Sequence, residues 1–257
     1  MQVVILCGGL GTRLREETEY RPKPMVPIGG RPMLWHIMKI YASHGHKDFV
    51  LCLGYKGDVI KQYFLNYQPY TSDFTLKLGR NPSIRYHNSH DEEDWSVTLL
   101  ETGADTQTGG RLRRAMEHIK DEEFLCSYGD GLTDSDINAS IAFHRSHGAV
   151  ATLTAVPPAG RFGELAIDRQ TVTAFEEKPE TQHGFINGGF FVFNRKIAGY
   201  LDDDSCVLER KPLEKLASEG NLKAYCHTGF WHCMDTYREQ MILEQMWNKK
   251  EAPWKNW

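Results

Sequence analysis

Near the N-terminus, a glycine-rich segment and two basic side chains have the composition of a phosphate-binding site. Residues 8–14 read GGLGTRL and directly follow the apolar run 3–6, and Lys23 stands further along between two prolines. Successive backbone N–H groups in a glycine-rich turn form a concavity for anions. Arg13 and Lys23 would add fixed positive charge, and an arginine can contact phosphate through two N–H groups at once. We therefore expect this segment to hold a polyphosphate, such as that of a nucleoside triphosphate.

Two better-known phosphate motifs do not fit this glycine-rich segment. No Gly-Lys-Ser/Thr follows at the spacing of a P-loop, and Leu14 stands where a dinucleotide fingerprint has its third glycine. The glycines alone are equally typical of an ordinary turn after a strand. Lys23 favours the functional interpretation, because the prolines on either side of it stiffen the backbone.

Two aspartates are candidate ligands for Mg²⁺, which typically takes one or two carboxylates together with substrate phosphate oxygens. Asp130 lies between two glycines after the apolar run 124–128, where it could equally be a turn residue. Asp235 is the second candidate. It precedes a helical pattern, and the local sequence by itself favours a helix N-cap at this position.

Composition limits the classes of function. The 257 residues carry a net charge of -4 without a long basic block, which argues against a nucleic-acid surface. No apolar run approaches the ~18 residues of a membrane span, and the N-terminal run is too short for a signal sequence. The six cysteines are scattered, without a C-x-x-C pair, and neither Cys226-His227 nor His232-Cys233 matches a common zinc spacing. We expect a cytoplasmic protein without membrane or nucleic-acid partners.

The elements that must position these residues alternate between strand and helix. Hydrophobic periodicity predicts strands at 2–7, 48–53, 124–128 and 149–155, and helices at 32–43, 58–65, 111–119, 134–147 and 236–247. This alternation predicts an α/β fold with a mostly parallel, Rossmann-like sheet, whose ligands lie beyond the carboxyl ends of the strands. Residues 66–103, with strand-like pieces at 74–78, 84–88 and 97–101, read as a hairpin-like excursion. We expect one domain over 1–257, with 164–257 as its C-terminal part.

The motifs together resemble those of the sugar-1-phosphate nucleotidyltransferases. The resemblance rests on GGLGTRL at 8–14, PKPM at 22–25, YGDG at 128–131, EKP at 177–179, INGG at 186–189 and GFW at 229–231 through Asp235, in the order in which the family has them. It covers essentially the whole chain. It implies the nucleotide-diphospho-sugar transferase fold and transfer of a nucleotidyl group to a sugar 1-phosphate.

The resemblance also implies a role for individual residues. Lys23 and Arg13 would be catalytic, and Asp130 and Asp235 would hold Mg²⁺. The nucleotide would contact Leu6, Cys7, Gly8, Gly9, Gly11, Thr12, Arg13, Lys23, Thr106, Arg111 and Gly129. The sugar phosphate would contact Glu177, Lys178, Asn187 and Trp231. Read without the resemblance, segments 177–179 and 187–189 are ordinary turns, Arg111 is a solvated helix residue, and Trp231 belongs either to the core or to a pocket wall.

The segment 29–38, GGRPMLWHIM, resembles the branch of the family that uses CTP and glucose 1-phosphate. A uridylyl- or thymidylyltransferase is the alternative, and a non-catalytic binding module is the alternative from another class. Such a module would be expected to lack Lys23 or one of the two aspartates. The chain departs from the family pattern at Cys7, where a small alanine is usual, and at His232-Cys233. The resemblance further implies a homo-oligomer, a hexamer, with 66–103 as a contact region.

Overall fold

The computed structural model describes residues 1–12, 14–87, 94–158, 164–168, 171–176 and 184–257. Its centre is a seven-stranded sheet in the order β14-β10-β13-β8-β1-β4-β7. All neighbours in this sheet pair in parallel except β13, which runs antiparallel to β8 and β10. The strands are β1 (Gln2–Leu6), β4 (Asp48–Leu53), β7 (Ser96–Glu101), β8 (Glu123–Tyr128), β10 (Ala151–Val156), β13 (Ile186–Asn194) and β14 (Leu222–Cys226). The predicted α/β fold with a mostly parallel sheet is confirmed.

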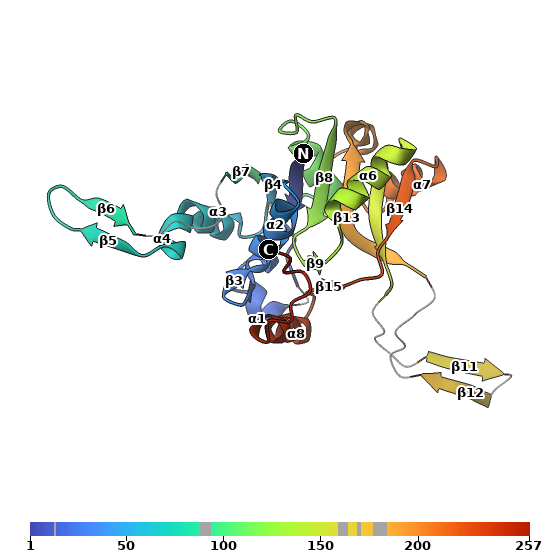
Figure 1. The fold of residues 1–257 in the computed structure, drawn as a ribbon. Helices are drawn as coiled ribbons and strands as arrows, with labels where there is room; N and C mark the ends of the chain where they lie inside the picture. Colours follow the sequence, from blue (N-terminus) through green and yellow to red (C-terminus); the bar gives the residue numbers. More distant parts are fainter. Residues whose placement is uncertain (13, 88–93, 159–163, 169–170, 177–183) are drawn as a thin grey trace.

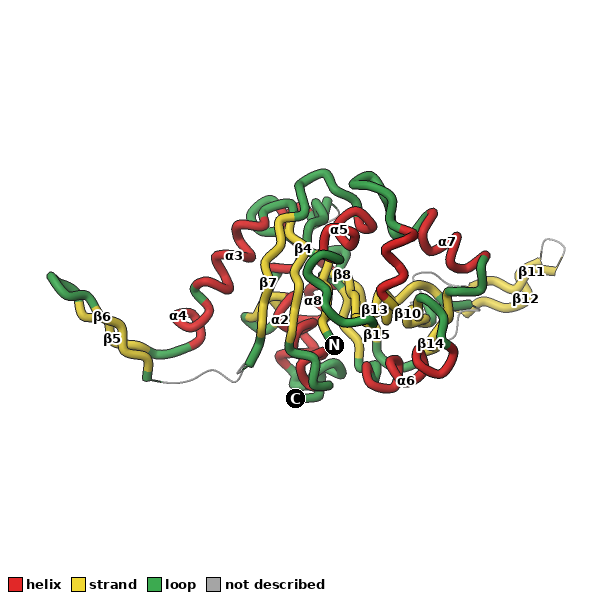
Figure 2. Tube along the Cα trace, turned by 90° about the horizontal axis from the view of Figure 1, so that it is seen from above, coloured by secondary structure: helices red, strands yellow, loops and turns green. Residues whose placement is uncertain are grey.

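Helices cover both faces of the sheet (Figure 2), so the interior strand β1 is buried on both sides. Because side chains alternate along a strand, Val3 and Ile5 of β1 pack in one apolar cluster and Val4 and Leu6 in the other. The helices are α1 (Arg15–Thr18), α2 (Met33–Ser43), α3 (Gly57–Leu65), α4 (Tyr67–Thr71), α5 (Thr108–Ala115), α6 (Ile137–His147), α7 (Lys211–Ser218) and α8 (Tyr237–Asn248), with 3-10 turns η1 (Lys23–Met25) and η2 (Arg195–Tyr200). None of the helices in the described ranges is both long and apolar enough to cross a membrane.

Small two-stranded sheets accompany the central one. They are formed by β2 (Pro27–Ile28) with β3 (Arg31–Pro32), β5 (Phe74–Lys77) with β6 (Ser83–Tyr86), β9 (Gly131–Thr133) with β15 (Trp231–Cys233), and β11 (Glu164–Asp168) with β12 (Thr171–Glu176). The hairpins β5–β6 and β11–β12 extend away from the body of the molecule on opposite sides (Figure 1). The β9–β15 pair lies under the carboxyl edge of the sheet and carries the site described below.

Two predicted elements need correction. Residues 97–101 were expected in the hairpin-like excursion, but β7 is an edge strand of the central sheet, parallel to β4, and only β5 and β6 form the hairpin. The helix expected at 111–119 spans Thr108–Ala115, so Gly109 and Gly110 lie within it. A Cβ at Gly110 would lie 2.7 Å from the Cα of Asp204. These glycines therefore permit close packing and do not break the helix.

The C-terminal residues pack against α2 through an aromatic cluster around His36. Trp254 is fully buried, and its indole N–H donates to Nδ1 of His36 at 3.4 Å. Nε2 of His36 lies 2.8 Å from the carbonyl oxygen of Ile28. Since Nδ1 accepts, Nε2 is the protonated nitrogen of a neutral ring. Burial of this ring lowers the pKa of His36 to about 4.

The stability of the protein should consequently fall between pH 6.5 and 4. The unfolded chain takes up a proton on His36 near its ordinary pKa of about 6.5, whereas the folded protein does so only near 4. The contribution of neutral His36 is therefore complete above the unfolded pKa and is lost as pH decreases, up to about 3 kcal/mol. Urea unfolding at several pH values measures this slope. His36→Gln should flatten it and the exposed His118→Gln should not, and an unchanged slope in His36→Gln would contradict the assignment.

Candidate active site

The glycine-rich loop begins where β1 ends, at the carboxyl edge of the sheet. Gly11 has a φ of 62°, a left-handed conformation that favours glycine. A Cβ on Gly8 would lie 2.2 Å from the guanidinium of Arg111, so that position also requires glycine. The side chain of Cys7 points into the core, and its backbone N–H donates to the carbonyl of Cys52. Arg13 lies outside the described residues.

A cavity of about 540 Å³ opens beside this loop. It brings together most of the residues that the sequence predicted for a nucleotide. Those that line it are Leu6, Gly8, Gly9, Gly11, Thr12, Lys23, Thr106, Arg111 and Gly129, together with Asp130 and Asp235. Cys7 is the one predicted nucleotide residue of the described chain that does not line it. The loop after β1, the segment before α5 and the end of β8 thus surround one space, as expected beyond the carboxyl ends of parallel strands.

Lys23 stands at the floor of this cavity and bridges the two candidate metal-binding aspartates. Its Nζ donates to Oδ2 of Asp130 at 2.6 Å and to Oδ1 of Asp235 at 2.6 Å. Burial by itself lowers the pKa of Lys23, but the charge of Asp130 and the hydrogen bonds to both carboxylates outweigh it, so this pKa lies above the ordinary lysine value. A Cβ on Gly129 would lie 2.7 Å from Cγ of Pro24. The glycine before Asp130 thus lets the Pro24 ring pack close and places Lys23 against both carboxylates.

Asp235 reaches this point through the pairing of β15 with β9. Cys233 lies opposite Gly131, and the N–H of Met234 donates to the carbonyl of Asp130 at 2.9 Å. Residues 231, 233 and 235 share one face of this extended chain because side chains alternate. The N-cap alternative for Asp235 is wrong, since Thr236 is the N-cap of α8.

Thr236 and Glu239 form a capping box at the start of α8. Glu239 Oε2 also accepts the N–H of Asp235 at 2.7 Å, so the box holds the aspartate as well as the helix. Thr236→Ala should lower the free energy of unfolding by about 1 kcal/mol. In a chain of this length that is a fall of about 2–4 °C in Tm in a thermal scan. Thr236→Ser keeps the hydroxyl and should retain the wild-type Tm, so equal losses in both variants would contradict the capping role.

A second cavity of about 290 Å³ adjoins the first and shares Tyr128, Asp130 and Asp235 with it. Asn187 and Trp231, both predicted for the sugar phosphate, line this cavity. Trp231 is thus a wall of the pocket. Its indole N–H donates to the carbonyl of Gly188 at 2.7 Å, and this hydrogen bond to the backbone fixes the orientation of the ring. Glu177 and Lys178 lie outside the described residues and stay predictions.

Tyr128 and Glu209 had no predicted role, yet both line the second cavity. The hydroxyl of Tyr128 donates to Oε1 of Glu209, and Oγ1 of Thr108 donates to Oε2 of the same carboxylate at 2.7 Å. Burial, followed by the charge of Glu209, raises the pKa of Tyr128 above the ordinary tyrosine value, so the hydroxyl stays a donor. Gly189 has a φ of 78°, and a Cβ there would lie only 2.4 Å from the ring of Tyr128. The motif YGDG contained a signal for Tyr128, whereas Glu209 lies in a charged stretch without one.

Arg111 is buried and binds backbone, contrary to the solvated alternative. Its guanidinium donates to five acceptors at or just after the ends of three strands: the carbonyls of Gly8, Leu53, Gly103 and Ala104 and the hydroxyl of Thr102. Burial lowers the pKa of this guanidinium, which nevertheless remains charged. Arg111 therefore adds positive charge to the cavity wall and ties the glycine loop to its neighbours.

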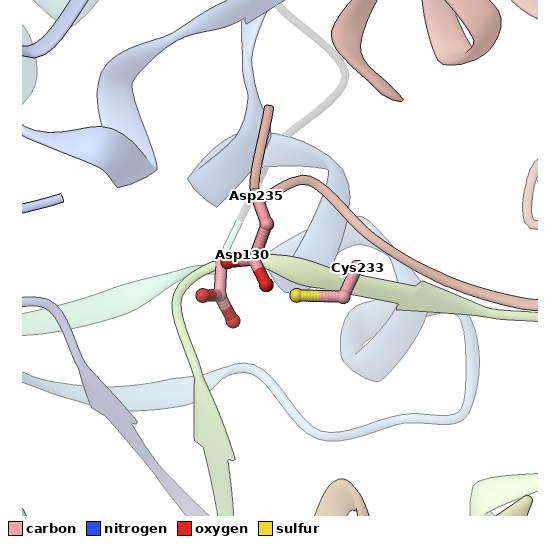
Figure 3. Close-up of side chains that lie close together, drawn as sticks. All are labelled: Asp130, Cys233 and Asp235. Carbon is pink, nitrogen blue, oxygen red and sulfur yellow. The ribbon is translucent and has the colours of Figure 1, made fainter. Parts of the chain in front are cut away.

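Two carboxylates that converge on an ammonium group are suited to hold a divalent cation together with phosphate oxygens. Figure 3 shows Asp130 and Asp235 beside each other with the thiol of Cys233 next to them. One ligand atom from each of these three residues lies within 4.8 Å of the others. Burial raises the pKa of Cys233. In the sequence, Cys233 stood out as a poor match to zinc spacing and as a departure from the family pattern, but it had no predicted role, because its neighbour Asp130 comes from a distant segment.

The chain is similar in sequence and fold to known proteins. A family model described as "Nucleotidyl transferase" matches residues 2–236. The chain is 53% identical over the full length of both chains to a glucose-1-phosphate cytidylyltransferase from Salmonella typhi, and 43% identical over the full length of both to a probable glucose-1-phosphate cytidylyltransferase from Bacillus subtilis. Among solved structures, HddC from Yersinia pseudotuberculosis matches with a TM-score of 0.70 and 24% identity, over 96% of this chain and 99% of that one.

Proposed function

Because the chain belongs to the nucleotidyl transferase family, we propose that it transfers a cytidylyl group from CTP to glucose 1-phosphate, giving CDP-glucose and pyrophosphate. The substrates are those in the name of the Salmonella relative. The observation that carries the proposal is the position of Lys23, Asp130 and Asp235. The two aspartates line both the cavity beside the glycine loop and the cavity lined by Asn187 and Trp231, and Lys23 bridges the two carboxylates.

The two cavities fit the two substrates. The cavity beside the loop offers Arg111, Lys23 and backbone N–H groups to a triphosphate. The adjoining cavity offers the amide of Asn187, the hydroxyl of Tyr128 and the carboxylate of Glu209, which are groups that bind sugar hydroxyls. The sugar phosphate would then face the α-phosphate across the shared residues.

The reaction follows from this arrangement. A phosphate oxygen of the sugar 1-phosphate attacks the α-phosphorus, and the bond from that phosphorus to the bridging oxygen of pyrophosphate breaks. The attacking oxygen is already ionised, so no side chain has to remove a proton. Positioning and charge stabilisation therefore account for catalysis. Lys23 would leave the carboxylates and stabilise negative charge on the transferred phosphate, with Arg13 as a second predicted cation.

Asp130 and Asp235 would hold Mg²⁺. They fit this ion because both offer carboxylate oxygens and both already bind a cation, the ammonium of Lys23. When bound, the ion supplies positive charge to the phosphate oxygens. Glu177 and Lys178 are proposed on resemblance to contact the sugar and its phosphate.

Pyrophosphate release tests the proposal and the base specificity together. The protein is incubated with Mg²⁺, glucose 1-phosphate and each nucleoside triphosphate in turn. We expect release with CTP. Release only with UTP or dTTP would favour the uridylyl or thymidylyl alternative, and no release with any nucleotide would favour a non-catalytic binding module.

We also propose that the protein is a homo-oligomer that uses the β5–β6 hairpin as a contact. Phe74, Leu76, Leu78 and Ile84 are exposed there, which is unusual for so many large apolar side chains on one short hairpin. Light scattering of the intact chain and of Leu76→Asp with Ile84→Asp measures the mass. A smaller assembly is expected in the variant, and a wild-type monomer would contradict the proposal.

A further inference from the structure

Cys233 lies on the same face of the chain as Asp235 and beside Asp130. The β9–β15 pairing places Cys233 opposite Gly131, the residue after Asp130. Side chains two apart on an extended chain point to one side, so the thiol and the carboxylate of Asp235 face the same space. Figure 3 shows the sulfur directed toward the two carboxylates, and the three ligand atoms lie within 4.8 Å of one another.

A cation already binds at this cluster. The ammonium of Lys23 lies 2.6 Å from an oxygen of each carboxylate, and Asp235 is 8% exposed. The cluster thus differs from a solvated group of acidic residues, because both carboxylates face an ammonium group whose side chain is only 12% exposed.

The donor set of this cluster differs from a plain magnesium site. Mg²⁺ selects oxygen ligands and gains nothing from sulfur. Zn²⁺ and related soft cations bind thiolate, carboxylate and water together. A thiol next to two carboxylates therefore changes which metal the same pocket prefers.

We propose that Cys233 completes, with Asp130 and Asp235, a site for a thiophilic divalent cation such as Zn²⁺ or Cd²⁺. One part rests on the proposed function: this cation should displace Mg²⁺ from the same carboxylates and so inhibit transfer. In a tetrahedral site, Zn–S of about 2.3 Å and Zn–O of about 2.1 Å separate sulfur and oxygen by about 3.6 Å. The distances between the three ligand atoms would therefore have to shorten by about 1 Å, and rotation of the side chains allows this.

Metal binding would replace two positive charges at the cluster, the thiol proton and the ammonium of Lys23. The thiol of Cys233 releases its proton to solvent as the sulfur–metal bond forms, and the ammonium of Lys23 leaves the carboxylates. Three protein ligands leave a fourth position for water.

Titration of metal-free protein with Cd²⁺ alone tests the inference. Thiolate–cadmium charge-transfer absorption reports sulfur ligation, and calorimetry gives the affinity. Wild type should show the band at one equivalent. Cys226→Ser, which removes an exposed thiol, is the matched control and should keep the band. Cys233→Ser should lose it and bind Cd²⁺ about tenfold or more weakly, since even the loss of an outer-shell partner weakens metal binding by about that factor.

Asp130→Asn provides a second variant, which keeps the thiol and should also weaken Cd²⁺ binding by about tenfold or more. If circular dichroism shows that Cys233→Ser is unfolded, the Cd²⁺ affinity of Asp130→Asn tests the proposed site in its place. Absence of the band from wild type, its persistence in folded Cys233→Ser, or wild-type affinity in Asp130→Asn would each overturn the inference. The titration contains neither nucleotide nor sugar phosphate, so its outcome is separate from that of the pyrophosphate assay.

Discussion

Lys23→Ala is expected to lower kcat/KM by about 10²–10³-fold, in the range found when one charge-stabilising group is removed from an active site. The ammonium donates to both Asp130 and Asp235, at 2.6 Å each. In the transition state the ammonium would stabilise negative charge on the transferred phosphate, which the alanine side chain cannot do. Steady-state pyrophosphate release with CTP and glucose 1-phosphate measures the loss. Lys196→Ala, which removes an exposed lysine far from both cavities, should have wild-type turnover.

The same variant separates catalysis from folding. Without the ammonium, the two carboxylates face each other uncompensated, so Mg²⁺ should raise the Tm of Lys23→Ala more than that of wild type. A folded Lys23→Ala protein with normal turnover would show that Lys23 only neutralises the aspartates. A variant that regains stability with Mg²⁺ but not activity supports the catalytic role.

The glycine-rich loop after β1, the central strands and the family could be predicted because their signals are local. The apolar run before the glycines, the alternation of strands with helices and the order of short motifs each depend on neighbouring residues. The family match confirms the identification made from these motifs. The arrangement of the sheet explains why these segments meet: the carboxyl ends of β1, β7 and β8 lie at one edge, so the segments that follow them line one cavity.

Other parts of the site depend on pairings between distant segments, which composition and spacing do not encode. Cys233 joins Asp130 only because β15 pairs with β9. Glu209 reaches the second cavity through hydrogen bonds from Tyr128 and Thr108. The edge strand β7 has the same alternating pattern as a hairpin strand, and only its register with β4 distinguishes them. Local signals also misled at Asp235, where the true N-cap lies one residue later.

Arg111 shows how a residue can support the nucleotide cavity through the backbone. Its guanidinium holds Gly8 in the loop after β1, Leu53 at the end of β4 and Thr102 after β7. The glycines at 8 and 54 leave space for it, since a Cβ at either would lie within 2.4 Å of its nitrogen or carbon atoms. Carbonyl oxygens from three strand ends thus converge on one buried cation.

Arg111→Met should therefore lower the free energy of unfolding by about 3–5 kcal/mol, because it fills the space but leaves several buried acceptors without a donor. For a chain of this length the Tm falls by about 6–20 °C. The KM for CTP should also rise, because the loop loses its anchor and the cavity loses a positive charge. Urea unfolding and steady-state kinetics measure the two effects.

Arg114→Met on the same helix is the matched control. The guanidinium of Arg114 makes an exposed ion pair with Asp204, and such solvent-exposed pairs contribute little to stability. Arg111→Lys keeps the charge but not the planar set of five N–H groups, so it should recover little of the lost stability. If Arg111→Met loses no more stability than Arg114→Met, the strand ends are held together by other contacts. If it loses stability but keeps the wild-type KM for CTP, the guanidinium acts on the fold alone and does not contribute to nucleotide binding.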